Sequence, residues 1–149
     1  MAGPSPRVPI VVSHTSGLTF AVQIGNHRLT VDQPRRAGGD DAGPSPLDLL
    51  GASLGACVAY YVHQFCRTRA ISSEGLRVEV VQHGASAPAR VGRFEVRVIL
   101  PPAMPDEYAE LVERVARTCP AHGTLTHGSE VVVTTERSDG VLGVMTGSL

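Results

Sequence analysis

The sequence predicts a single α+β domain, and three patterns carry this prediction. Two β-prone runs, 18–24 and 27–31, flank Gly25-Asn26, a pair typical of a two-residue hairpin turn. A stretch without formal charges, 49–66, indicates a long helix. Two later runs alternate apolar and charged residues with the period of half-exposed strands. At 149 residues the chain has the length of one domain, so one compact unit must hold every functional group.

A long loop follows the predicted hairpin. Residues 32–45 are rich in glycine, proline, arginine and aspartate, which predicts an extended polar connection. Loops of this length inside compact domains are often functional. The domain is expected to span 1–149, with residues 1–10 and 138–149 as flexible tails.

The long helix has a clear start. Ser45 suits the N-cap, Pro46 suits the first helical position, and Asp48 lies where its carboxylate closes a capping box. The helix is expected to run to about Arg69. Its small residues leave a flat surface that suits close packing of another helix, such as the same helix of a second subunit. These residues are Gly51, Ala52, Gly55, Ala56 and Ala59.

Three further strands are expected after the helix. The alternating runs 76–82 and 92–100 predict two half-exposed strands joined by a loop around Pro88. Residues 130–135 form a last β-prone run, which predicts a final strand.

A second helix is expected between these strands. Pro105 and the two acidic residues after it favour a helix start, and Pro120 favours an end at Cys119. The apolar residues of this helix fall on one stripe, which turns Cys119 inward.

Charge and composition exclude several functions. The 13 basic residues are all arginine and face 14 acidic ones, for a net charge of -1 and a pI near 6.6. We therefore expect neither a nucleic-acid nor a membrane partner, and no lysine is present for Schiff-base chemistry. The uncharged stretch 49–66 is barely long enough to span a membrane and contains His63 and Gln64, which favours a buried helix. The N-terminal residues lack a signal-peptide pattern, so a cytoplasmic location is expected.

The three cysteines divide by position. Cys57 shares a helix face with Leu54 and Tyr61, whereas Cys66 lies about 180° round an ideal helix. Cys57 can meet Cys119, because the second helix must pack its apolar stripe on the long first one. A redox pair is one interpretation. Buried cysteines acting as small hydrophobic residues are the other.

Two sequence blocks then carry a family resemblance. The first is GGDDAGPSPLDLLGASLGAC over 38–57, and the second is CPAHGTL over 119–125. With these blocks in this order, the chain resembles the OsmC/Ohr family of osmotically inducible and organic hydroperoxide resistance proteins over about residues 15–135. The resemblance implies an OsmC-like α+β fold with an N-terminal β-hairpin, a long central Cys-bearing helix, two strands, a second Cys-bearing helix and a final strand. It also implies an intertwined homodimer.

The resemblance further implies a chemistry. Family members include thiol peroxidases that reduce organic hydroperoxides and, less well, hydrogen peroxide in oxidative stress defence. By position, Cys57 corresponds to the peroxidatic cysteine and Cys119 to the resolving one. An external dithiol would reduce their disulfide. No metal, flavin or haem cofactor is implied.

Two groups before Cys57 are candidates for activating it. Peroxidase members use an arginine from the loop before the helix, and Arg35 or Arg36 lies there, with Arg36 preferred. These members also place a glutamate directly after the helix-starting proline, where this sequence has Leu47. Asp48 is the nearest acid, but the capping box alone is sufficient to explain it. Solvation is likewise sufficient to explain the arginines.

Leu47 also leaves a second function open. A non-peroxidatic OsmC-like protein would bind a small ligand in the same dimer cleft, and in a third interpretation the thiols are inert. The spacing of Cys119, His122 and His127 is compatible with metal ligands, but no second ligand cluster accompanies them, and no metal is expected. His63 and Tyr61 are expected to pack locally.

Overall fold

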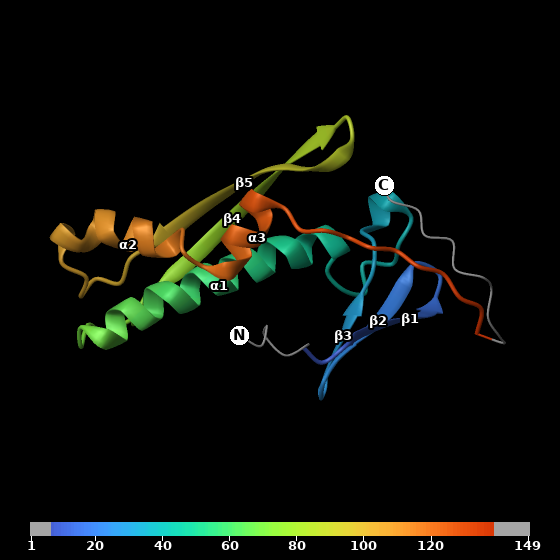
Figure 1. Cartoon of the computed structure of the whole chain (residues 1–149), viewed down its shortest axis with the longest axis horizontal. Coiled ribbons are helices and arrows are strands. Elements are labelled where there is room, and N and C mark those ends of the chain that lie inside the picture. Colours follow the sequence, from blue (N-terminus) through green and yellow to red (C-terminus); the bar gives the residue numbers. More distant parts are fainter. Residues whose placement is uncertain (1–6, 139–149) are drawn as a thin grey trace.

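The computed structural model describes residues 7–138 and has the predicted mixed α+β architecture (Figure 1). The elements in chain order are β1 (Ile10–Ser16), β2 (Thr19–Ile24), β3 (His27–Val31), η1 (Arg35–Ala37), α1 (Pro46–Thr68), β4 (Arg77–Ser86), β5 (Ala89–Ile99), η2 (Asp106–Tyr108), α2 (Ala109–Ala116) and α3 (Pro120–His127). Most of the two expected tails, 1–10 and 138–149, lies outside the described residues.

The N-terminal sheet is antiparallel with strand order β1-β2-β3. The hairpin predicted at Gly25-Asn26 is confirmed, because Ile24 pairs with His27 across it. Strand β1 was not predicted. All of its residues are exposed, so it lacks the alternation that marks a half-buried strand.

Helix α1 begins and ends where the sequence indicates. The Asp48 N–H donates to the Ser45 hydroxyl, and Asp48 Oδ2 accepts the Ser45 N–H at 3.0 Å, so the capping box is complete. The buried stripe of α1 is turned slightly away from the face that Leu54, Cys57 and Tyr61 share. Leu50 is exposed and Cys57 is half-buried, while the side chains at positions 54, 58, 62 and 65 fill the core.

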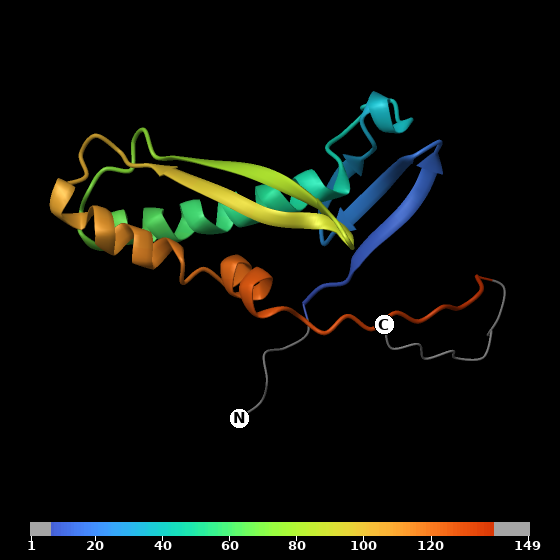
Figure 2. The same ribbon diagram turned by 90° about the horizontal axis from the view of Figure 1, so that it is seen from above.

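The core lies where α1 packs against β4 on one side and against α2 and α3 on another (Figure 2). It consists of Leu54, Val58, Val62, Phe65, Cys66, Met104, Val112, Ala116 and Cys119. Cys66, expected to face away from the other two cysteines, is therefore inside the same core as Cys119.

Strands β4 and β5 form the second sheet and confirm the alternating pattern. They are longer than predicted and extend to either side of Pro88. Val78 pairs with Val98 on the face toward the core, and Glu79 pairs with Arg97 on the outer face.

The prediction of a second helix that ends at Cys119 is wrong about where the helix ends. It ends at Ala116 as α2, and a separate helix, α3, begins at Pro120. Pro120 was interpreted as a helix terminator, whereas it occupies the first position of a new helix with Cys119 as its N-cap.

The predicted final strand over 130–135 is also absent from the single chain. These residues are extended without a strand partner, and Val131 and Val132 are 81% and 72% exposed. A β-prone sequence forms a strand only when another strand offers hydrogen bonds, and none within residues 7–138 does so.

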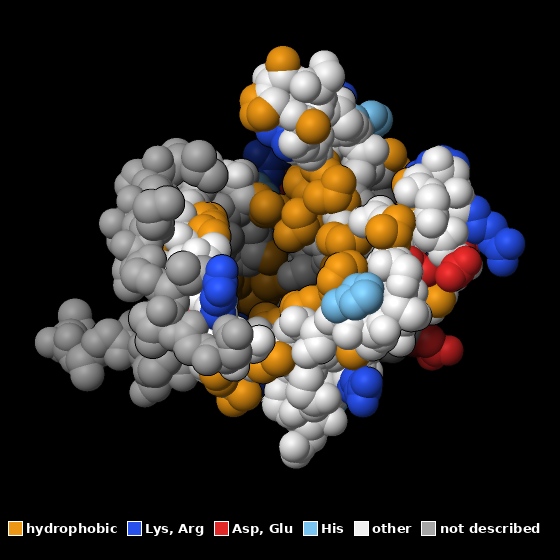
Figure 3. Space-filling model, turned by 90° about the vertical axis from the view of Figure 1, so that its right-hand side faces the viewer, with side chains coloured by type: hydrophobic (Ala, Val, Ile, Leu, Met, Phe, Trp, Pro, Cys, Tyr) orange, Lys and Arg blue, Asp and Glu red, His pale blue; other side chains and the backbone are white. Residues whose placement is uncertain are grey.

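The N-terminal sheet lies to one side of the core (Figures 1 and 2). Its strands pack on one another and make few contacts with α1, β4 or β5. Ile10, Val11 and Val12 are each more than half exposed. In the view of this end of the molecule, hydrophobic side chains surround a hollow (Figure 3).

Candidate functional site

The structure brings Cys57 and Cys119 into contact. Cys57 lies in the fourth turn of α1, and Cys119 caps the N-terminus of α3. Both are free thiols, with Cys57 half-buried and Cys119 completely buried. Their side chains interact directly, which contributes to the pKa of Cys119.

Burial raises the pKa of the Cys119 thiol, and the neighbouring Cys57 raises this pKa further. The His122 N–H opposes both effects by donating to Cys119 Sγ at 3.3 Å. Cys119 is therefore a protonated thiol at neutral pH. A protonated Cys119 has an S–H that can act as a hydrogen-bond donor toward the neighbouring Cys57 sulfur.

The sequence did not reveal how Cys119 is held. Its cap position and the His122 N–H both depend on α3, which was not predicted. The signal was present in Cys119-Pro120, because proline is favoured at the first position of a helix and the residue before it is then the N-cap.

Cys66 has a different environment from Cys57. It is completely buried in the core, and burial raises the pKa of its thiol. A thiol that stays protonated and has no access to solvent is a poor nucleophile.

The structure brings Arg36 close to Asp48, at the start of α1. The pKa of Asp48 is lowered by hydrogen bonds from the Ser45 hydroxyl and N–H, and also by the charge of Arg36. Arg35 and Arg36 are both exposed in η1, and Leu47 is exposed at the position of the family's acid. The capping role expected for Asp48 is realised in full.

Within one chain, Arg36 and Asp48 lie apart from the two thiols. Asp48 precedes Cys57 by nine residues on α1, which corresponds to about 13 Å along the helix axis. The arginine loop therefore lies at one end of α1 and the two thiols lie near its middle.

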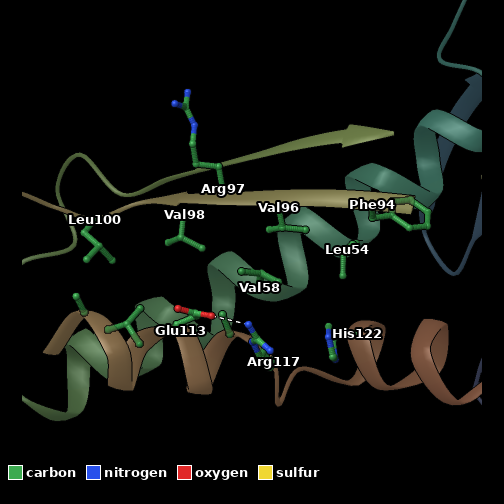
Figure 4. A pocket seen from close by; sticks show the side chains of 13 residues that line it. Leu54, Val58, Phe94, Val96, Arg97, Val98, Leu100, Glu113, Arg117 and His122 are labelled. Carbon is green, nitrogen blue, oxygen red and sulfur yellow. Dashed lines mark hydrogen bonds and ion pairs between the residues drawn. The ribbon is translucent and has the colours of Figure 1, made fainter. Parts of the chain in front are cut away.

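A cleft of about 560 Å³ is lined mostly by apolar side chains and includes neighbours of the two thiols, but neither Cys57 nor Cys119 lines it (Figure 4). Val58, the residue after Cys57, and His122, whose N–H bonds Cys119, both line it. Strand β5 and helix α2 form its two walls, with α1 behind them. The apolar lining comprises Leu54, Val58, Phe94, Val96, Val98, Leu100, Ala109, Val112 and Ala116. The Glu113–Arg117 ion pair lies at its polar edge, next to His122.

The small-residue surface of α1 is used differently from the expectation. A side chain at Gly51 would come within 2.9 Å of the Gln82 amide, and one at Gly55 within 3.1 Å of Val80. Both glycines therefore allow close packing of β4 and not of a second helix. A shallower groove of about 360 Å³ runs along the same contact.

The histidines do not gather into a ligand set. Among residues 7–138, no three His, Cys, Asp or Glu side chains are arranged to hold a metal ion. His127 interacts through Nδ1 with the Gly123 carbonyl, and His63 Nδ1 lies 2.7 Å from Ser73 Oγ. Tyr61 packs at the edge of the core, as expected.

Helix α1 is long and apolar enough to cross a membrane by length and composition alone. It packs on β4, α2 and α3 as the central helix of an α+β fold, and a core helix passes the same criterion.

The fold and the contacting thiols define a small α+β domain with a dithiol site. The family model for OsmC-like proteins matches residues 38–134, and the chain therefore belongs to the OsmC-like protein family. No curated protein matches the sequence.

Solved structures with similar folds come from several bacteria. A Psychrobacter arcticus protein named for osmotic stress and detoxification has a TM-score of 0.74 at 23% identity, over 80% of this chain and 89% of its own. An OsmC-like protein from Mycoplasma pneumoniae has a TM-score of 0.62 at 21% identity, over 83% and 89%. An organic hydroperoxide resistance protein from Legionella pneumophila has a TM-score of 0.52 at 21% identity, over 78% and 88%. At these identities the likeness concerns the fold.

Proposed function

We propose that this protein is a cytoplasmic thiol-dependent peroxidase that reduces organic hydroperoxides, and hydrogen peroxide less well, in defence against oxidative stress. One observation carries the proposal: the half-buried Cys57 thiol contacts the buried Cys119 thiol, and both are free. The name of the Legionella pneumophila structure, organic hydroperoxide resistance protein, supports the choice of substrate.

The reaction needs only the two thiols and an external dithiol. The Cys57 thiolate attacks the peroxide O–O bond and takes one oxygen as a sulfenic acid, while the other oxygen takes a proton and leaves as the alcohol. The Cys119 thiol condenses with the sulfenic acid, which releases water and forms the Cys57–Cys119 disulfide. The external dithiol then reduces this disulfide and restores both thiols.

The apolar cleft suits the organic part of the substrate. Its volume and mainly apolar lining are typical of sites for small molecules. The cleft is lined by Val58, which follows Cys57, and by His122, whose N–H bonds Cys119, so a hydroperoxide bound there is proposed to reach Cys57 from this side.

Arg36 is the proposed cation of the site, and Asp48 is proposed to orient it. The charge of Arg36 already acts on Asp48. We expect Arg36→Ala to slow alkylation of Cys57 at neutral pH, because a nearby cation favours the thiolate. Arg35→Ala is the matched control, and an unaltered rate in Arg36→Ala would remove Arg36 from the site.

A homodimer would join the two halves of this site. Within one chain Arg36 lies near the start of α1 and Cys57 near its middle, so a second copy running in the opposite direction along α1 can bring its own arginine loop to Cys57. Two unpartnered regions support such an intertwined dimer, namely the exposed sheet β1–β3 and the exposed valines at 131–133.

Steady-state consumption of cumene hydroperoxide, with dithiothreitol as reductant, tests the activity. We expect Cys57→Ser to abolish turnover and Cys119→Ser to reduce it strongly. Cys66→Ser is the matched control and should retain turnover. Equal rates in the natural chain and Cys57→Ser would contradict the proposal.

A second candidate function is binding of a small apolar ligand without peroxidase chemistry. Leu47 in place of the family's acid favours it, as does the size of the cleft. Under this alternative, cumyl alcohol would raise the melting temperature of the natural chain and Cys57→Ser equally, and neither would consume cumene hydroperoxide.

A further inference from the structure

We infer that Asp32 is a positioning residue for the arginine loop: its buried carboxylate fixes the backbone of 33–44 and thereby the place of Arg35 and Arg36. The inference rests on the proposed function in one respect, namely that an arginine of this loop acts on Cys57. The placement of the loop by Asp32 stands on the geometry alone.

The Asp32 carboxylate is buried and accepts hydrogen bonds mainly from backbone N–H groups of the loop, with one further hydrogen bond from the Thr19 side chain of β2. It is 1% exposed, yet it forms no ion pair with any described residue. Oδ1 accepts the Gln33 N–H at 2.7 Å, and Oδ2 accepts the N–H groups of Asp40 and Ala42 at 3.0 and 3.1 Å. A buried carboxylate without a cation is costly unless such hydrogen bonds hold it, so its role lies in the loop that supplies them.

The same hydrogen bonds that fix the loop also affect the pKa of the Asp32 carboxyl group. The Ala42 N–H, together with those of Gln33 and Asp40, lowers the pKa of Asp32 although burial opposes the change. The carboxylate is therefore ionised at neutral pH and accepts from both ends of the loop.

The loop closes on itself around Asp32. The Asp32 N–H donates to the Pro44 carbonyl at 3.2 Å, and the Asp41 N–H donates to the Gln33 carbonyl at 3.2 Å. Gly39 packs so tightly here that an added Cβ would lie 2.0 Å from the Gln33 oxygen. The first and last residues of the loop are thus tied together, and no side chain fits at Gly39.

The arginines depend on this backbone for their position. Neither Arg35 nor Arg36 forms a side-chain hydrogen bond or ion pair with another residue of 7–138. Their short helical turn is held by the Ala37 N–H, which donates to the Pro34 carbonyl at 2.8 Å. Loosening the carboxylate that anchors the loop would therefore displace both guanidinium groups together.

Two variants distinguish the effect of the Asp32 carboxylate from that of any other acidic side chain in the loop. Asp32→Asn keeps the shape but replaces an acceptor oxygen with an amide that cannot accept from the loop N–H groups. Asp40→Asn is the matched control, because it makes the same change in the same loop on an exposed side chain that accepts no hydrogen bond among the described residues.

Limited trypsin digestion tests the anchor directly, since the enzyme cuts after arginine and the loop carries Arg35 and Arg36. We expect cleavage after Arg36, measured by peptide mass, to be about tenfold faster in Asp32→Asn than in the natural chain. Asp40→Asn should match the natural chain. Unchanged cleavage in Asp32→Asn would overturn the inference.

The pH profile of Cys57 alkylation tests the link to the thiol. Asp32→Asn should move the profile to higher pH in the same direction as Arg36→Ala, and the double variant should move it no further than Arg36→Ala alone. An equal additional shift in the Arg36→Ala background would overturn the positioning role. If Arg36→Ala and Arg35→Ala together leave the profile unchanged, the arginine's part in the proposed function fails, and the digestion result still decides the role of Asp32.

Discussion

Two thiols in contact need not be equivalent, and here the depth of burial distinguishes them. Cys119 is completely buried, and burial raises the pKa of its thiol, whereas Cys57 keeps part of its surface open. The nucleophile of a thiol reaction must be both ionised and accessible. Cys57 meets the condition of access, whereas the buried Cys119 does not.

The third cysteine, Cys66, is expected to affect stability and not the reactivity of Cys57. Cys66→Ser places a hydroxyl in the apolar core, which we expect to lower the free energy of unfolding by about 2 kcal/mol. Urea unfolding measures this loss. The rate of Cys57 alkylation should stay within about twofold of the natural chain, because Cys66 lies nine residues further along α1. A large change in that rate would connect Cys66 to the site.

Helix α1 is the central element of the fold, since it carries Cys57 and contacts β4, α2 and α3. Its capping box fixes where the helix starts and hence the register of every residue along it. The same box places the Asp48 carboxylate within reach of the charge of Arg36. The start of α1 is therefore both a structural cap and one edge of the proposed site.

The cap yields a prediction with a defined pH dependence. Ser45→Ala should lower the free energy of unfolding by about 1 kcal/mol at pH 7. The pKa of Asp48 is lowered from 3.8 in the folded chain, so its contribution is present above this value and is lost as the pH falls through the folded pKa. Asp48→Asn should therefore be less stable than the natural chain at pH 7, and the difference should shrink as the pH falls below 3.8. Urea titrations at pH 7 and at a series of lower pH values check this, and a difference in unfolding free energy that does not shrink with falling pH would contradict it.

Local sequence signals were sufficient for the elements whose structure depends on local physics. Ser45-Pro46 marks the start of α1, Gly25-Asn26 marks a hairpin, and alternation marks β4 and β5. Each signal acts within a few residues of the structure that it specifies.

Other features depend on contacts that no local signal encodes. Strand β1 is exposed on both faces, and the β-prone run 130–135 has no strand to pair with in the single chain. The separation of Arg36 from Cys57 follows from the length of α1 and the closure of the loop by Asp32. The resemblance led to Cys57 and Cys119, but not to the buried carboxylate, because a single aspartate at a strand end is typical of many loops.

The whole molecule has an open arrangement for its size, because the sheet β1–β3 lies beside the core and not on it (Figure 1). Isolated sheets of a few strands are stable only when a hydrophobic face is covered. Large exposed apolar areas on a small protein mark surfaces that another chain covers. A second copy of this chain would cover them and would also bring the arginine loop to the thiols.

Sedimentation equilibrium tests this arrangement. We expect a mass near twice the 15.7 kDa of the chain at micromolar concentration. Val132→Asp should shift the protein toward monomer, because it places a charge on an exposed valine that a partner would bury. A mass near that of one chain for the natural sequence would contradict the dimer.

The central claim is that peroxide oxidation joins Cys57 to Cys119, and counting free thiols tests it most directly. The reduced protein is exposed to one equivalent of cumene hydroperoxide per chain, and its thiols are counted after denaturation. We predict a fall from three thiols to one in the natural chain, with Cys66 as the remaining thiol, and no loss of a thiol pair in Cys57→Ser or Cys119→Ser. Three free thiols in the natural chain after long exposure would contradict the account.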